Sequence, residues 1–278
     1  MPEGDTIFRT ARTLHLALAG REVVRFETRY AHLQRVHDEA PITGRRVEAV
    51  TSRGKHLLVA FTGRLVLRTH MRMSGSWHVY RPGEPWKLPR GQMRLVLATA
   101  AFEAVAFNVQ EAEFLEAPAL ARSPVGRLGP DLLAPDFDDA DALRRLRTRD
   151  GDAIGEVLLD QRVVAGLGNV YRSEVLFLAR LHPDTPVRAL MDEELRALLD
   201  LARRLLQANV LPTSGPGILT RHSLRRTTGR EAPGAALWVY QREGQPCRAC
   251  GTPIARARRG PDARVAWWCP RCQPAPAL

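Results

Sequence analysis

The four cysteines of this chain all lie near its end, as two Cys-x-x-Cys pairs: Cys247 with Cys250, and Cys269 with Cys272. This spacing is typical of a structural zinc site, in which four thiolates surround the metal as a tetrahedron at about 2.3 Å. Disulfides are the alternative, but nothing in the sequence indicates export. A redox pair fits less well, because the two pairs are matched and no βαβ pattern surrounds them. The sequence therefore predicts one structural Zn²⁺, which folds a segment too short to fold alone.

The charge of the chain indicates its class of partner. The formal net charge is +11 and the pI is about 10.6, a balance that favours a polyanion, most often nucleic acid. A merely solvated basic surface would give the same total. Arginines surround the cysteines, which suits a metal-pinned hairpin that contacts a nucleic-acid groove. We find neither a run of about 18 apolar residues nor a secretory leader, and we expect no membrane segment and a cytoplasmic location.

Lysine is rare in this chain, where almost every basic residue is arginine. It occurs only at Lys55 and Lys87. Arginine binds phosphate with a planar fork but cannot release its proton, so a retained lysine indicates a position that needs an amine. Lys55, in Arg53-Gly54-Lys55-His56, is a candidate of this kind, and a surface residue at a strand end is the alternative.

Hydrophobic periodicity divides the chain into regions of different structure. Apolar residues at helical spacing predict a helix over 4–19 that ends near Gly20, and short alternating runs over 21–116 predict strands of an antiparallel sandwich or barrel. Helical signals follow a Pro- and Gly-rich stretch. Four helices are expected: Asp138 or Asp139 capping one through Arg147, Asp152 capping one to Gln161, and two more over 169–181 and 191–208. The predicted segments are 1–117, a linker over 118–137, 138–240 and 241–273.

The first residues carry a candidate nucleophile. Removal of Met1 would leave Pro2 with a free secondary amine, and α-amino groups have pKa values of about 7.7–8.0, so a useful fraction is neutral at pH 7. Attack of this amine on an aldehyde-like carbon gives an iminium, which is a good electron sink. Glu3 lies beside it as a candidate general acid. The alternative is that Pro2 only marks removal of the initiator.

A second candidate site is the turn Gly166-Leu167-Gly168-Asn169, which opens a helical segment. Two glycines permit a tight turn and a close approach of the backbone, and the start of the helix would present N–H groups to an anion such as a phosphate. A plain connecting turn would explain the glycines nearly as well. The turn is not a P-loop, because the Gly-Lys-Ser/Thr element is missing.

Taken together, these motifs resemble the bacterial formamidopyrimidine-DNA glycosylase and endonuclease VIII family, over nearly the whole chain. The resemblance rests on Pro2-Glu3-Gly4, on Gly54-Lys55-His56, on the stretch from Leu159 to Glu174, and on Arg264 to Gln273. It implies an α+β multidomain fold: an N-terminal antiparallel β-sandwich with an N-terminal helix, a helix–two-turn–helix domain and a C-terminal zinc-finger β-hairpin.

The resemblance also implies an activity, that of a bifunctional DNA glycosylase and AP lyase of base excision repair. Pro2 would form a Schiff base with C1′ of the damaged nucleotide, and Glu3 would protonate the deoxyribose. Lys55 would assist β-elimination, and Arg264 would support δ-elimination. The DNA contacts that the resemblance implies are Asn169 at the turn, Arg127, and the loop residues His70, Arg72 and Met73. Met73 could fill the gap left by a flipped base, and Arg72 could face the opposite strand.

Two departures from the family pattern bear on the substrate. Asp5 and Thr6 replace the common Pro-Glu after Gly4, and residues 107–114 lack the Arg-Arg-Phe-Gly loop of the purine-directed branch. Oxidised pyrimidines are therefore favoured over 8-oxoguanine, which stays the alternative within the family. Outside the family, a non-catalytic zinc-finger DNA-binding protein and a small-molecule enzyme with an N-terminal proline stay open. The expected partner is damaged duplex DNA bound by a monomer, without a nucleotide cofactor.

Overall fold

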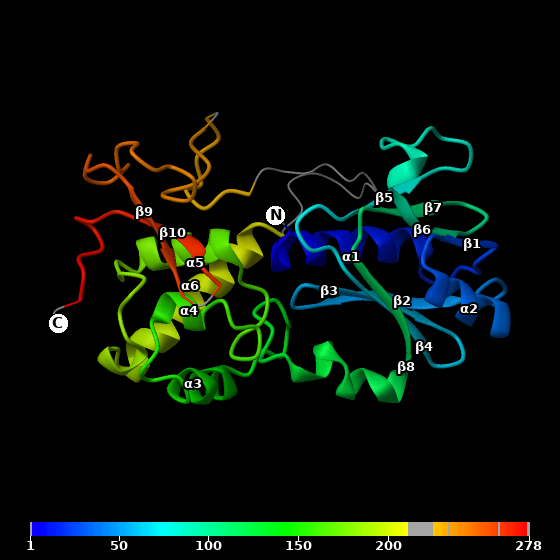
Figure 1. Cartoon of the computed structure of the whole chain (residues 1–278), viewed down its shortest axis with the longest axis horizontal. Coiled ribbons are helices and arrows are strands. Elements are labelled where there is room, and N and C mark those ends of the chain that lie inside the picture. The colour runs from blue at the N-terminus through cyan, green and yellow to red at the C-terminus, as the bar shows by residue number, and fades with distance from the viewer. Residues whose placement is uncertain (1, 211–224, 233, 261, 277–278) are drawn as a thin grey trace. The chain divides into compact units, whose positions relative to one another are not determined.

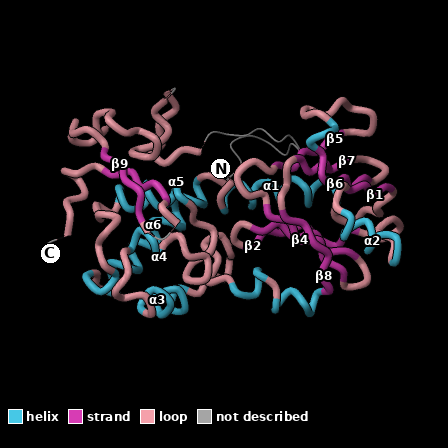
Figure 2. Tube along the Cα trace, viewed as in Figure 1, coloured by secondary structure: helices cyan, strands magenta, loops and turns pink. Residues whose placement is uncertain are grey.

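The computed structural model describes residues 2–210, 225–232, 234–260 and 262–276. These residues form two compact units, one ending at Arg127 and the other beginning at Leu128 (Figures 1 and 2). The break falls inside the stretch expected to be a linker, which contains two 3-10 helices, Ala117–Arg122 and Pro124–Arg127. The finer division of the chain into four segments stays a prediction.

The first unit consists of two antiparallel four-stranded sheets and two helices, so the predicted sandwich is confirmed. One sheet has the order β2-β3-β4-β8, with β2 Val47–Arg53, β3 His56–Phe61, β4 Leu65–His70 and β8 Glu111–Glu116. The other has the order β1-β6-β7-β5, with β1 Arg25–Thr28, β6 Met93–Ala98, β7 Glu103–Phe107 and β5 Ser76–Tyr80. The helices are α1 Gly4–Leu18 and α2 Ala31–Glu39, and a 3-10 turn spans Arg90–Gln92.

Helix α1 forms because its apolar residues recur on one face. Ile7, Ala11, Leu14 and Leu18 are all buried, and α1 contacts strands of both sheets. The helix ends as predicted, because Gly20 adopts a φ of +76° that disfavours other residues. The sequence did not predict α2, in which only Leu33 is buried. A single buried position leaves no periodicity to recognise.

The second unit is helical and ends in a short hairpin. Its helices are α3 Asp139–Arg147, α4 Ile154–Val157, α5 Asn169–Leu178 and α6 Asp192–Ala208, with a 3-10 turn at Val187–Ala189. Strands β9 Ala255–Arg259 and β10 Arg264–Trp268 pair antiparallel. The fold class predicted from the sequence is thus confirmed. None of the described helices is long and apolar enough to cross a membrane.

Two capping predictions in this unit have opposite outcomes. Asp138 caps α3 as expected, because its Oδ1 accepts a hydrogen bond of 2.8 Å from the backbone N–H of Asp141. The long helix expected from Asp152 to Gln161 is wrong. Helix α4 covers only Ile154–Val157, and the carboxylate of Asp152 accepts a hydrogen bond from Arg149 Nε at 2.5 Å. The residue that directly precedes α4 is Ala153 and not Asp152, so the aspartate does not cap this helix.

Candidate functional site

The start of α1 buries two carboxylates beside Pro2. The Glu3 and Asp5 residues are both 0% exposed, while Pro2 is partly exposed. The carbonyl of Glu3 accepts hydrogen bonds from the backbone of Thr6 and Ile7 at 2.9 and 3.1 Å, which fixes Glu3 as the residue that precedes the helix. A buried carboxylate at a helix N-terminus lies where the helix dipole favours negative charge.

Asp5, one of the departures from the family pattern, has described partners on the same helix. Arg9 Nη2 donates to its Oδ2 at 3.5 Å, and Thr6 Oγ1 donates to its Oδ1 at 3.4 Å. The Asp5 side chain is fully buried whereas Arg9 is 25% exposed. Asp5 and Thr6 thus belong to a hydrogen-bonded group at the start of the helix.

The end of the β2-β3-β4-β8 sheet gathers five polar residues, which we call the sheet-end cluster: Lys55, His56, His70, Arg72 and Glu111. Lys55 lies in the β2–β3 turn after Gly54, whose φ is +56°. His56 pairs in register with His70 of β4, and His70 pairs with Glu111 of β8. The two imidazole rings meet edge to face with centroids 4.8 Å apart.

Both histidines of the sheet-end cluster are held neutral. Burial, with the positive charges of neighbours that include Arg68, Arg72 and Lys55, lowers the pKa of His56 to about 3. Burial also lowers the pKa of His70 to about 4, although Glu111 acts in the opposite direction. Each Nδ1 is an acceptor, from Arg68 Nη1 at 3.0 Å and from the Arg72 backbone at 3.2 Å respectively. The remaining proton of each ring is therefore on Nε2.

The β4–β5 loop holds one methionine inside and presents another outside. Met71 is 2% exposed, whereas Met73 is 67% exposed. The backbone N–H of Gly75 donates to the Met71 carbonyl at 2.9 Å, and a Cβ on Gly75 would lie 2.5 Å from that oxygen. Only glycine closes the loop this tightly, and the result is an apolar side chain held out into solvent on a fixed backbone.

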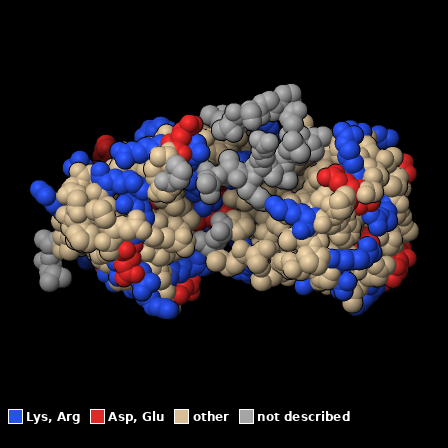
Figure 3. All heavy atoms as spheres, turned by 90° about the horizontal axis from the view of Figure 1, so that it is seen from above, with Lys and Arg blue, Asp and Glu red and all other residues tan. Residues whose placement is uncertain are grey.

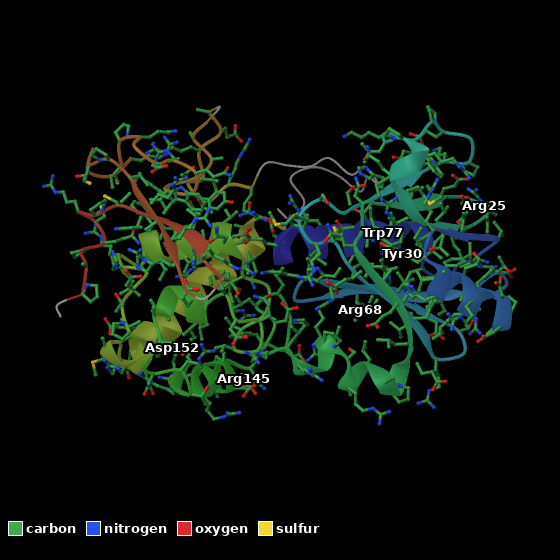
Figure 4. All side chains as sticks on the ribbon, in the orientation of Figure 1. Arg25, Tyr30, Arg68, Trp77, Arg145 and Asp152 are labelled. Carbon is green, nitrogen blue, oxygen red and sulfur yellow. The ribbon has the colours of Figure 1, made fainter. Side chains whose placement is uncertain are left out.

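Arg68 and Glu113 support the sheet-end cluster from within the sheet. Arg68 is 5% exposed and donates from Nε to Glu113 at 2.5 Å. Figure 4 labels it among the strands of the first unit. Glu111 has a lowered pKa: partial burial alone would raise it, but the hydrogen bond and charge of Arg72 outweigh burial.

In the second unit, Gln161 shapes the glycine turn. Its side-chain oxygen accepts from the N–H of Gly166 at 3.1 Å, and its amide donates to the carbonyls of Leu159 and Leu167 at 3.0 and 2.9 Å. Helix α5 then begins at Asn169, as predicted.

Asn169 and Arg172 of α5 attach the hairpin to the helices. Asn169 Nδ2 donates to the Val265 carbonyl at 2.9 Å, and Arg172 Nη2 donates to the same oxygen at 2.7 Å. Arg172, 0% exposed, also donates to Asn169 Oδ1 at 2.5 Å and to Glu156 at 3.2 Å. Because Arg172 can only donate, the amide orientation of Asn169 is fixed. The chain position next to Val265 is Arg264, whose side chain is 45% exposed.

The fully buried Glu174 organises the chain that leads into the hairpin. Its carboxylate accepts from the backbone N–H groups of Trp238, Val239 and Tyr240 at 2.7, 2.9 and 2.9 Å, and from the hydroxyl of Thr227. The sequence singled out neither Arg172 nor Glu174 by function. The only sign of their importance in the sequence was that both lie in the stretch from Leu159 to Glu174, on which the family resemblance partly rests.

The four cysteine sulfurs lie together, all within 4.8 Å of one another. Two of the Sγ–Sγ distances are 3.9 Å, from Cys247 to Cys272, and 3.5 Å, from Cys250 to Cys269. A zinc–sulfur distance of about 2.3 Å in a tetrahedron requires sulfurs about 3.8 Å apart. Four thiolates this close would repel one another strongly, so a cation among them is needed to hold them in the charged form. The donor set fits one structural Zn²⁺.

The surfaces of both units carry more basic than acidic side chains on the face shown in Figure 3. Arg127 is exposed at the end of the first unit, and Arg264 is exposed at the start of β10. Among the residues expected to matter, the structure brings Lys55 together with His70 and Arg72 at one sheet end, and Asn169 next to the Arg264 strand.

Three family models match the chain. The N-terminal domain of formamidopyrimidine-DNA glycosylase matches residues 1–111, its H2TH domain matches 128–218, and a zinc finger found in FPG and IleRS matches 244–275. A Streptomyces coelicolor protein named probable endonuclease 8 2 is 43% identical over 280 residues, covering 100% of this chain and 95% of that protein. A Mycolicibacterium smegmatis protein named DNA-(apurinic or apyrimidinic site) lyase Nei2 is 38% identical over 275 residues, covering 99% and 100%.

Solved structures of a formamidopyrimidine-DNA glycosylase also match this chain over almost its whole length. A point mutant of the Lactococcus lactis FPG protein, in complex with Fapy-dG-containing DNA, matches with a TM-score of 0.80 and 25% identity, over 99% of this chain and 100% of that one. The two-sheet unit, the helical unit and the four-thiolate hairpin define a DNA-repair glycosylase with a structural zinc finger. The chain belongs to the formamidopyrimidine-DNA glycosylase and endonuclease VIII family, and it is a bifunctional DNA glycosylase and AP lyase of base excision repair.

Proposed function

We propose that Pro2 is the nucleophile of this enzyme and that its main substrates are oxidised pyrimidines in duplex DNA. The observation that supports the catalytic assignment is the fully buried Glu3 carboxylate directly after Pro2, at the start of a 15-residue helix. With Met1 removed, the Pro2 nitrogen attacks C1′ as the bond from C1′ to the damaged base breaks, and the amine proton leaves with the base. Glu3 protonates the ring oxygen as the C1′–O4′ bond opens, which leaves an iminium on Pro2.

The iminium then allows strand cleavage without a metal in the reaction. It acidifies the C2′ proton, whose removal expels the 3′ phosphate in β-elimination. Lys55 assists this step, and its position in the β2–β3 turn, close enough for its charge to act on His56 and His70, supports the assignment. Arg264 holds the phosphate for the second, δ-elimination, from the start of β10. Asn169 and Arg127 bind further phosphates, and the neutral His70 donates from Nε2.

The extruded nucleotide leaves a gap in the duplex, which Met73 fills. Extrusion costs a few kcal/mol, and an inserted apolar side chain offsets part of that cost. A preference for oxidised pyrimidines is supported by residues 107–114, which lack the Arg-Arg-Phe-Gly loop of the purine-directed branch and contain no arginine. We propose that the enzyme acts as a monomer.

Borohydride trapping tests the nucleophile. Processed protein is incubated with an abasic-site duplex and reductant, and peptide mapping locates the adduct. We expect a covalent complex at Pro2, its loss in Pro2→Thr, and a strongly reduced yield in Glu3→Gln. The matched control is Glu116→Ala, an exposed carboxylate at the end of β8. An adduct that maps to Lys55 instead would overturn the assignment.

The substrate class is tested separately, with duplexes that contain thymine glycol, dihydrouracil or 8-oxoguanine. Base release and nicking are both measured under single turnover. Faster release of the two pyrimidines supports the proposal, whereas faster release of 8-oxoguanine opposite cytosine would assign the enzyme to the purine-directed substrates.

A further inference from the structure

The turn between β9 and β10 rests on a carboxylate of α4. Glu156 is the third residue of α4, and its carboxylate lies on the side of Gly260 from which a side chain would project. A Cβ built on Gly260 would overlap this carboxylate and would lie 3.0 Å from Glu156 Cγ. Gly260 also has a φ of +67°, which favours glycine. The hairpin runs along α5, and its turn approaches α4 this closely because position 260 has no side chain (Figure 1).

The Glu156 carboxylate is itself fixed. The end of a glutamate side chain ordinarily rotates away from a neighbour at little cost, but Glu156 is only 19% exposed and its Oε1 accepts a hydrogen bond from the fully buried Arg172 at 3.2 Å. The helix that carries Glu156 is also held in place. The N–H of Gly155 donates to the Pro183 carbonyl at 3.0 Å, and a Cβ on Gly155 would lie 2.8 Å from the same oxygen.

Arg264 lies between this turn and a second fixed point. The Gly260 carbonyl accepts from the N–H of Ala263 at 3.1 Å, which closes the turn directly before Arg264. The carbonyl of Val265, directly after Arg264, accepts from Arg172 Nη2 at 2.7 Å. One buried guanidinium therefore reaches both sides of Arg264: the turn side through the α4 carboxylate, and the strand side directly.

The arginine opposite Arg264 is paired within the protein. Arg259 lies across the hairpin in register with Arg264, and like charges at such positions repel each other. Asp184 Oδ1 is 2.8 Å from Arg259 Nε, and the Arg259 guanidinium is 5.1 Å from the ring centroid of Trp268. The Arg264 side chain is 45% exposed, and its partner Asp262 is 3.5 Å away and 72% exposed. A surface ion pair of this kind is weak, so a phosphate can displace it.

We propose that Glu156 is a positioning residue for δ-elimination: it seats the β9–β10 turn on α4 and thereby sets where the Arg264 guanidinium meets the phosphate. This inference rests on the proposed function, in which Arg264 holds the phosphate for that step. Misplacement of a catalytic contact by about 1 Å can cost about 100-fold in rate. By charge alone, Glu156 would oppose a phosphate ligand. Loss of its charge and loss of its position therefore have opposite expected effects.

The experiment compares two successive reactions of the same bound DNA. The full enzyme, in excess, is mixed with an end-labelled duplex that contains a preformed abasic site. The β-elimination product, which ends in an unsaturated aldehyde, is separated from the δ-elimination product, which ends in a phosphate. We expect Glu156→Ala to lower the ratio of the δ rate to the β rate by roughly tenfold. The yield of borohydride-trapped complex should stay close to that of the wild type.

Two further variants separate position from charge. Glu156→Gln keeps the shape of the side chain and an acceptor for Arg172, so it should keep most of the wild-type ratio. A role through charge would instead raise the ratio in both Glu156→Gln and Glu156→Ala. Gly260→Ala brings a methyl group against the carboxylate and should lower the ratio. The double variant of Glu156→Ala with Gly260→Ala should have a ratio close to that of Glu156→Ala, because the clash needs both groups.

Glu243→Gln is the matched control. Glu243 pairs with Arg256 at 2.9 Å, near the end of β9 that is remote from the turn. This variant also removes a carboxylate that contacts the hairpin, and its ratio should equal that of the wild type. A destabilised protein would lose trapping and both eliminations together, which the ratio does not register. Loss of bound zinc from Glu156→Ala would overturn the inference, because the carboxylate would then support the fold of the zinc finger.

Arg264→Gln distinguishes failure of this inference from failure of the proposed function. A wild-type ratio in Arg264→Gln would defeat the proposed role of Arg264 in δ-elimination, and the role of Glu156 with it. A reduced ratio in Arg264→Gln, together with a wild-type or raised ratio in Glu156→Ala, would overturn the role of Glu156 alone.

Discussion

At the residue scale, the sheet-end cluster concentrates positive charge next to buried imidazoles. Burial is the largest cause that lowers the pKa of both His56 and His70, and Arg68, Arg72 and Lys55 act in the same direction. An unfolded histidine titrates near about 6.5. The folded chain therefore resists a proton that the unfolded chain accepts, and acid favours the unfolded state.

This difference predicts how stability depends on pH. The neutral histidines contribute their full stabilisation above about pH 6.5, and this contribution is lost as the pH falls toward the folded pKa values of about 4 and about 3. We expect the free energy of unfolding to fall by about 1–2 kcal/mol per histidine between pH 6.5 and 5. Urea unfolding at several pH values measures this. In His70→Gln, the slope of the free energy of unfolding against pH should decrease by the equivalent of about one proton. A slope equal to that of the wild type would contradict a neutral, buried His70.

The sequence could identify functional residues whose partners lie a few positions away in the chain. It could not identify residues whose partners are distant in the chain. The cysteine pairs and Pro2-Glu3 are local patterns, so the sequence alone could indicate a metal site for the first and a candidate nucleophile with its acid for the second. Glu111 acts on Arg72 across 39 positions, and no local pattern joins a carboxylate at a strand start to an arginine in a loop. Such a pair exists only once the strand register is known.

At the element scale, α5 links the glycine turn to the zinc hairpin through one buried arginine. Arg172 donates to Glu156, to Asn169 and to the Val265 carbonyl. Arg172→Met would remove the donor that binds the partly buried Glu156 carboxylate, Asn169 Oδ1 and the Val265 carbonyl. We expect a loss of about 3 kcal/mol in the free energy of unfolding and faster release of zinc to a chelator.

Arg144→Met is the matched control for this variant. Arg144 lies on α3, its side chain is 69% exposed, and its ion pair with Asp141 is on the surface, so its removal should cost less than about 1 kcal/mol. Denaturant unfolding and a chelator assay measure both variants. Equal midpoints and equal zinc release would show that Arg172 does not attach the hairpin.

Helices and strands could be predicted from the sequence where a local feature, such as a helix cap or an alternating pattern, determines them. Asp138 caps α3 because its carboxylate accepts from the first turn of the helix, whereas Asp152 is paired with Arg149 and the expected long helix is replaced by α4 and turns. The strands β5, β7 and β8 were not individually predicted. β7 is buried at four of its five positions, so the alternation that reveals a half-exposed strand is absent.

At the scale of the whole molecule, the charge of +11 and the basic surfaces of both units predict binding that depends strongly on salt. Each neutralised phosphate contributes a slope of about −0.9 to log K against log[salt] in duplex DNA. With Arg127 and Arg264 as proposed phosphate ligands and Lys55 as a further cation near the cleaved strand, we expect a slope of about −3 or steeper for an abasic-analogue duplex. Fluorescence anisotropy over a salt series measures it, and a flat plot would contradict an electrostatic footprint.

The contribution of the zinc hairpin to that slope can be isolated. Arg264 leads β10, whose neighbouring carbonyl at Val265 is fixed by Asn169 and Arg172, so its substitution should remove one phosphate contact without moving the strand. We expect Arg264→Gln to make the slope shallower by about one unit. Arg25→Gln, whose guanidinium is paired with Glu103 at 2.7 Å and Glu27 at 3.4 Å, should keep the wild-type slope. Equal slopes for wild type and Arg264→Gln would show that the hairpin arginine does not contact a phosphate.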